Sequence, residues 1–73
     1  MSNVVALTLR ADAIRRAADG YDEPWNEYFQ AVYPAFGRET AMRMANSHIK
    51  HMKRRDDAIL AVVAVEMAEP QHA

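Results

Sequence analysis

The sequence contains no cysteine, so neither a disulfide framework nor a thiolate metal site can supplement a hydrophobic core. Its two glycines, Gly20 and Gly37, lie far apart and cannot form the glycine-rich loop that holds a phosphate group. The longest apolar run, residues 58–65, is far shorter than the roughly 20 residues that span a bilayer, and the N-terminus lacks the layout of a signal peptide. We therefore expect a cytoplasmic protein that makes no contact with a membrane and is stabilised by packing alone.

The proportions of apolar and charged residues are those of a folded protein. Of the 73 residues, 51% are hydrophobic and 26% are charged, which distinguishes the chain from a disordered tail. A chain of this length buries only about 60% of the surface that its unfolded form exposes. We expect a single domain with a thin core.

The net charge of −1 conceals a basic segment between two acidic ones. Residues 38–55 carry six cationic side chains against Glu39 alone, whereas residues 11–30 sum to −3 and residues 56–73 to −4. A cluster of positive charge raises the affinity for phosphates or for an acidic protein surface even when the whole chain is nearly neutral. The cations are Arg38, Arg43, Lys50, Lys53, Arg54 and Arg55.

Capping and turn residues divide the first half of the chain into two predicted helices. Thr8 can cap a helix of about ten residues, and Gly20 can take the left-handed conformation that ends it. Pro24 suits the first turn of a second helix, where its missing amide donor is not needed, and Pro34 closes or kinks that helix. The segment before Thr8 alternates loosely in hydropathy, so we expect residues 1–8 to form an extended or flexible arm.

The second half of the chain is predicted to contain two further elements. Apolar residues recur at spacings of three and four, which predicts a helix over residues 38–54. Asp56 or Asp57 can cap a following apolar segment, residues 58–67. The β-branched residues of that segment also permit a strand, paired with the N-terminal arm, but its alanines and its methionine favour a helix.

These elements predict a mainly α fold. We expect a small domain of three to four helices over residues 9–68, with the short extended N-terminal segment able to form a minor β element. Residues 69–73 are expected to form a flexible tail.

No arrangement of side chains indicates catalysis or a metal site. His48 and His51 stand three residues apart and could face one metal ion, but a closed site needs two further ligands, and the basic neighbours would repel a cation. Asp56 and Asp57 are adjacent and therefore point in different directions, which is unsuited to shared acid–base work. Neither Ser2 nor Ser47 has a neighbouring general base that would activate it as a nucleophile. We expect a protein without enzymatic activity, metal or cofactor.

All six aromatic side chains lie within the sixteen residues from Tyr21 to Phe36. Aromatic side chains usually pack in a hydrophobic core, and tryptophan and tyrosine also anchor protein interfaces. Tyr21 and Tyr33 lie off the helical stripe of the other rings, so we expect these two at the surface.

The basic segment is the strongest functional signal in the sequence. At helical spacing Arg43, Lys50 and Arg54 share one face with Ser47. Cations near a helix C-terminus also interact favourably with the helix dipole, which explains part of the cluster structurally. We expect the other cations of the cluster to contact phosphates or an acidic protein surface. The residues expected to bind a partner in this way are Arg43, Lys50, Lys53, Arg54 and Arg55.

Three stretches carry a resemblance that covers the whole chain: the opening Met1–Leu9, the Asp22–Trp25 segment and the basic run His48–Arg55. In these, in its length and in its acidic-basic-acidic layout, the chain resembles the small regulators that bacteriophages of xanthomonads make to control host RNA polymerase. The resemblance implies a protein of the host bacterial cytoplasm that binds the large polymerase subunits near the RNA exit channel, inhibits promoter-specific initiation and promotes antitermination. It also implies that the N-terminal arm docks on the polymerase through Val4, Val5, Ala6, Leu7 and Thr8.

A second class of function stays open at this point. The basic helix would equally serve a small DNA-binding repressor or a phage inhibitor of host defence. Electrostatic contact with RNA or DNA fits every one of these functions. We expect the protein to act as a monomer.

Overall fold

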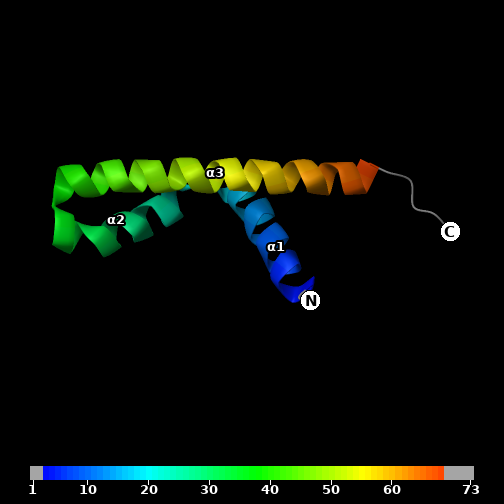
Figure 1. Cartoon of the computed structure of the whole chain (residues 1–73), viewed down its shortest axis with the longest axis horizontal. Helices are drawn as coiled ribbons and strands as arrows, with labels where there is room; N and C mark the ends of the chain where they lie inside the picture. The colour runs from blue at the N-terminus through cyan, green and yellow to red at the C-terminus, as the bar shows by residue number, and fades with distance from the viewer. Residues whose placement is uncertain (1–2, 69–73) are drawn as a thin grey trace.

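The structure is a computed structural model that describes residues 3–68, with side chains from Leu7 onward. It contains three helices, α1 (Asn3–Asp19), α2 (Asp22–Phe36) and α3 (Arg38–Ala68), so the predicted mainly α fold is confirmed. Figure 1 shows α2 folded back along the first half of α3, while α1 branches away from the middle of α3. Within the described residues, α1 and α2 each contact α3 but not each other. The predicted tail, residues 69–73, lies outside the described residues.

α3 is one continuous helix of 31 residues, about 46 Å long. The predicted boundary at Asp56 and Asp57 is wrong, because the Asp56 carboxylate bonds to side chains outside α3 and does not cap a helix. No glycine or proline occurs within α3, so its backbone hydrogen bonds continue without interruption. The expectation of helix in preference to strand over residues 58–67 is confirmed.

α1 begins at Asn3, so residues 3–8 are helical and do not form the extended arm or strand predicted from hydropathy. Thr8 lies inside the helix and is not its cap. A strand needs a neighbour to pair its backbone N–H and C=O groups, and its predicted partner, residues 58–67, belongs to α3. A helix satisfies these groups internally, which explains the difference.

Two glycines with positive φ separate the helices. Gly20 (φ 90°) follows α1 and Gly37 (φ 82°) joins α2 to α3, in a backbone region that residues with a side chain rarely adopt. The N–H of each donates to the carbonyl oxygen four residues earlier, at 2.7 and 2.9 Å respectively. Pro24 lies in the first turn of α2 as predicted, but α2 continues past Pro34 to Phe36. Pro34 leaves the carbonyl of Gln30 without its helical donor, but both residues are exposed, so water can replace that donor.

The core is thin, as expected for this length. The buried apolar residues in the described part are Ala13, Ala41 and Ala45, whose small side chains let the helices approach closely. The largest side chain that is fully buried there is the carboxylate of Asp56. Hydrophobic burial alone therefore does not specify how the helices fit together.

Aromatic rings of α2 stack on one another and contact side chains of α3. Trp25 stacks on Phe29 with a centroid distance of 5.1 Å, and its indole Nε1–H donates to Asn46 Oδ1 at 2.7 Å. Tyr33 is 45% exposed, as predicted. Tyr21 is half-buried, contrary to prediction, because its hydroxyl reaches a carboxylate on α3.

Candidate binding face of helix α3

Four polar side chains recur along α3 at spacings of four, three and four residues: Arg43, Ser47, Lys50 and Arg54. All four are exposed, whereas Ala45, on the opposite side of the helix, is fully buried. We call these four residues the outer face. The face extends over about 16 Å of helix, so its cations are held in a fixed register.

The other two predicted contacts do not lie on the outer face. Lys53 and Arg55 are exposed, but helical geometry turns them toward opposite flanks of α3. Arg55 lines a shallow depression together with His48, His51 and Met52. Three of the five predicted cations therefore share one face, and the other two extend the positive charge to either side.

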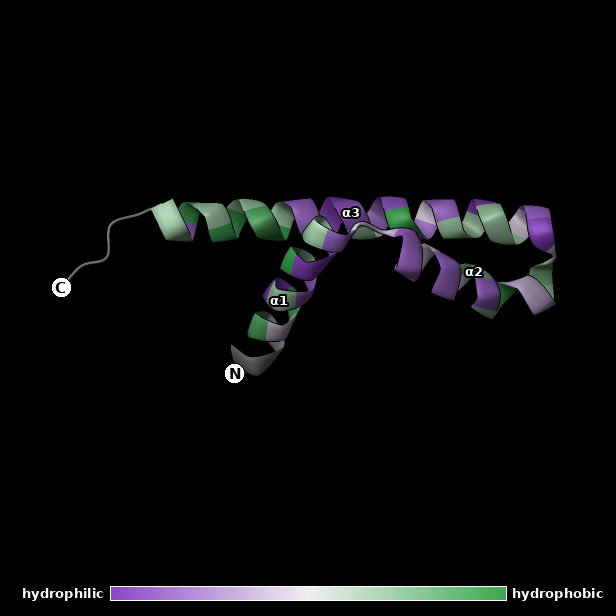
Figure 2. Cartoon of the chain, turned by 180° about the vertical axis from the view of Figure 1, so that it is seen from behind, coloured by the Kyte–Doolittle hydropathy of each residue, from purple (hydrophilic) through white to green (hydrophobic). Residues whose placement is uncertain are grey.

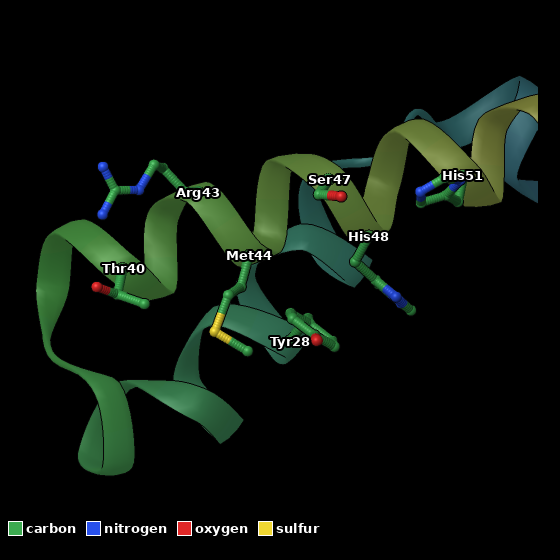
Figure 3. A pocket seen from close by; sticks show the side chains of 7 residues that line it. All are labelled: Tyr28, Thr40, Arg43, Met44, Ser47, His48 and His51. Carbon is green, nitrogen blue, oxygen red and sulfur yellow. The ribbon is translucent and has the colours of Figure 1, made fainter.

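A shallow groove lies beside the outer face, where α2 approaches α3 (Figure 3). The rings of Tyr28 from α2 and His48 from α3 stack there, with centroids 4.1 Å apart and planes inclined by 10°. Arg43 extends away from these rings in Figure 3. The groove is open to solvent along its length, so it is better suited to contact with a macromolecular surface than to enclosing a small substrate. Its lining residues are Tyr28, Thr40, Arg43, Met44, Ser47, His48 and His51.

The predicted docking segment, Val4–Thr8, forms the first turns of α1. Leu7 within it is 61% exposed. Figure 1 shows this end of α1 directed away from α3, on the side of the C-terminal half of α3. The outer face occupies residues 43–54, toward the other end of α3, so the structure does not bring the two predicted binding regions into one surface.

A buried ion pair holds α1 against α3. Arg16 donates from Nε to Asp56 Oδ2 at 2.6 Å and from Nη2 to Asp56 Oδ1 at 2.9 Å. The Tyr21 hydroxyl, at the start of α2, donates to the same Oδ2 at 2.9 Å. The Asp56 side chain is completely buried and that of Arg16 is 13% exposed. One carboxylate thus connects all three helices.

The capping interpretation of Asp56 missed this cluster, although a signal for it exists in the sequence. Asp56 occupies a position in a seam of otherwise apolar residues that recur at alternating spacings of four and three. A carboxylate in such a seam faces the neighbouring helices and needs a charged or hydrogen-bonding partner there. The seam consists of Ala45, Ile49, Met52, Asp56, Ile59 and Val63.

The contacts among Arg16, Tyr21 and Asp56 shift the pKa values of all three side chains. The hydrogen bonds from Arg16 hold the pKa of Asp56 below its ordinary value; burial opposes this shift, and the Tyr21 hydroxyl reinforces it. Burial raises the pKa of Tyr21, as does the hydrogen bond that its hydroxyl donates to Asp56. The hydrogen bonds to Asp56 also raise the pKa of Arg16. The charged pair and the neutral phenol are therefore the stable forms at neutral pH.

These shifts predict a loss of stability in acid and in strong base. A lowered carboxyl pKa stabilises the fold above the unfolded value, about 4, and this contribution disappears as pH falls through the lower, folded-state pKa of Asp56. A raised phenol pKa stabilises the fold below about 10, and this contribution disappears as pH rises through the folded-state pKa of Tyr21. Urea denaturation at a series of pH values measures the free energy of unfolding on the acidic and on the basic side. Asp56→Asn should make the loss of stability in acid less steep. An unchanged dependence on pH in acid would contradict the role assigned to Asp56.

None of the described helices is both long enough and apolar enough to cross a membrane. From residue 3 to residue 68, no three histidine, aspartate or glutamate side chains are grouped so that they could hold a metal ion. Comparison of the chain with protein family models, with curated proteins and with solved structures finds no match.

Proposed function

We propose that this protein is a non-catalytic phage regulator of transcription that binds host bacterial RNA polymerase, inhibits promoter-specific initiation and promotes antitermination. The observation that carries the proposal is the position of Arg43, Lys50 and Arg54, three exposed cations on one side of a long helix whose other side packs on the rest of the chain. Such a face complements RNA phosphates or an acidic protein surface. The resemblance to small phage regulators of polymerase supplies the identity of the partner.

The proposed action is steric and electrostatic. α3 is a rod about 46 Å long, and its basic half can lie along the RNA exit channel. The first turns of α1, which contain the predicted docking segment, then contact a large polymerase subunit. A protein held there obstructs promoter-specific initiation, and on an elongating enzyme it occupies the path of the emerging RNA and favours readthrough.

A DNA-binding repressor receives less support from the fold. In a helix-turn-helix unit the two helices cross at about 90–120°, and the second helix enters the major groove. Here α2 lies back along α3, and a single residue, Gly37, joins them (Figure 1). Contact with the DNA backbone is the mode of DNA binding that the outer face would allow.

Binding of the purified full-length protein to purified bacterial core RNA polymerase tests the proposal. We expect a complex in the absence of nucleic acid, a decrease in promoter-directed transcript and increased readthrough of an intrinsic terminator. Deletion of residues 1–8 is expected to weaken the complex, with helical circular dichroism as the control for folding. Absence of a complex with polymerase would overturn the proposal, and tight binding to duplex DNA in its place would favour the repressor.

A further inference from the structure

The groove between α2 and α3 contains two rings that stack at an open surface. Tyr28 and His48 lie nearly parallel, with centroids 4.1 Å apart and planes inclined by 10°. Both side chains are only half-buried, and both line the groove. Each ring covers one face of the other, so a flat group that enters the groove can stack only on an outer face of this pair.

The second face of the His48 ring adjoins another hollow. His48 and His51 line both the groove and the shallow depression that Arg55 borders, whereas Tyr28 lines the groove alone. In Figure 3 His48 lies between Tyr28 and His51, so the face of its ring that Tyr28 does not cover is directed toward the depression. The two hollows together extend from Thr40 to Arg55, about 22 Å along α3, and we call them the ring groove.

The charges around the ring groove favour a polyanion. Arg43 and Arg55 line it, and the outer face runs along its edge, with Ser47 common to both. Of the described residues that line the ring groove, none carries a carboxylate. The acidic side chains of α2 line other depressions: Asp22, Glu23 and Glu27. A polyanion is therefore attracted to the ring groove and repelled from the acidic side of α2.

Rings, cations and hydroxyls together select single-stranded RNA among the polyanions. A duplex keeps its bases stacked inside the helix, whereas the bases of a single strand are free to stack on aromatic or histidine rings. The hydroxyls of Thr40 and Ser47 line the groove, and a hydroxyl can pair with the ribose 2′-OH that DNA lacks. Figure 2 shows the strongly hydrophobic part of α3 elsewhere, over residues 58–68, so the ring groove lies in the hydrophilic part of the molecule.

We propose that the ring groove binds single-stranded RNA, with a base stacked on the open face of the His48 ring. Arg43 and Arg55 contact the flanking phosphates, and the hydroxyls of Thr40 and Ser47 contact the ribose. Stacking of bases on rings tolerates any sequence, which suits contact with an emerging transcript. The inference rests on the proposed function only for the source of the RNA. Binding to free RNA requires no polymerase, so the two proposals can fail separately.

Fluorescence anisotropy of a labelled oligouridine of about ten nucleotides, titrated with the purified full chain in the absence of polymerase, tests the inference. We expect saturable binding that weakens as the salt concentration rises. Oligodeoxyuridine of the same length and duplex RNA should both bind more weakly. Absence of binding to oligouridine at low salt would overturn the inference. Equal affinity for oligodeoxyuridine would overturn the assignment to RNA, and equal affinity for duplex RNA would show that bases do not stack on the rings.

Loss of either ring should lower the affinity for oligouridine about tenfold. His48→Ala removes the ring on which the base stacks, and Tyr28→Leu removes the ring that holds it in place. Tyr28→Phe keeps the stack and should retain the native affinity. The matched control is Tyr33→Leu, at a tyrosine of α2 that is 45% exposed and does not line the ring groove. Equal losses for Tyr28→Leu and Tyr33→Leu, with the helical circular dichroism signal retained, would overturn the inference.

Photochemical crosslinking locates the RNA without any substitution. A thiouridine within the oligouridine reacts on irradiation with side chains that it contacts, and mass spectrometry of the digested protein identifies them. We expect crosslinks at Tyr28, His48 or His51, which line the ring groove. Crosslinks confined to α1 or to residues 58–68 of α3 would overturn the inference.

Discussion

Replacement of Asp56 by alanine is expected to lower the free energy of unfolding by about 3 to 5 kcal/mol, because it leaves the buried charge of Arg16 without its counter-ion. The Arg16 side chain is only 13% exposed, and two of its guanidinium nitrogens donate to the Asp56 carboxylate. The hydroxyl of Tyr21 loses its acceptor at the same time. Domains of this length have a total stability of about 4 to 11 kcal/mol, so the substitution should remove a large part of it.

Urea denaturation followed by the helical circular dichroism signal measures this loss, with all variants at one protein concentration so that association does not enter the comparison. Asp57→Ala is the matched control, since Asp57 is adjacent, is exposed and carries the same charge. It should change the free energy of unfolding by less than about 0.5 kcal/mol. Tyr21→Phe should cost about 1 to 2 kcal/mol. Equal effects at the two aspartates would show that the ion pair does not stabilise the fold.

We expect the Asp56 cluster to specify how the helices fit together more than it adds net stability. Replacement of a complete buried ion pair by apolar residues is often neutral or stabilising, whereas removal of one partner is costly. Here Arg16 from α1 and Tyr21 from the start of α2 meet one carboxylate of α3, which satisfies all three groups in a single arrangement. Because the buried apolar residues of the described part are alanines, we expect this polar contact to determine where α1 crosses α3.

The helical fold was largely predictable, because the apolar residues of α2 and of the first half of α3 recur at helical spacing. The errors came from residues that have more than one local role. An aspartate can cap a helix or lie in a buried ion pair, and the choice at Asp56 depends on Arg16, which is 40 residues away in sequence. Loose alternation of hydropathy before Thr8 suits a strand, but a strand also requires a partner that local sequence does not provide.

The outer face was predictable for a different reason. Arg43, Lys50 and Arg54 belong to one helix, so their common direction follows from spacing alone. The exposure of the apolar C-terminal third of α3 was not predictable in the same way, because it depends on the angle at which α1 leaves α3. That angle is set by tertiary contacts, the Asp56 cluster among them.

Reversing the charge of Lys50 and Arg54 together is expected to weaken binding to RNA polymerase about tenfold or more and to reduce its dependence on salt. Each cation that contacts a phosphate contributes about one unit to the slope of log affinity against log salt, so the slope should fall by about two. Partial binding should persist if α1 supplies a second contact with a polymerase subunit. A protein that binds DNA through the outer face alone should instead lose nearly all affinity for duplex DNA.

Fluorescence anisotropy titrations of the labelled protein against polymerase, duplex DNA and single-stranded RNA, each over a series of salt concentrations, measure these effects. Arg15→Glu combined with Arg38→Glu is the matched control, because it changes the net charge equally at two exposed cations away from the outer face. If both double variants lose affinity to the same extent, net charge and not the outer face governs binding. If only Lys50→Glu with Arg54→Glu loses affinity, the register of cations along α3 is the recognition element.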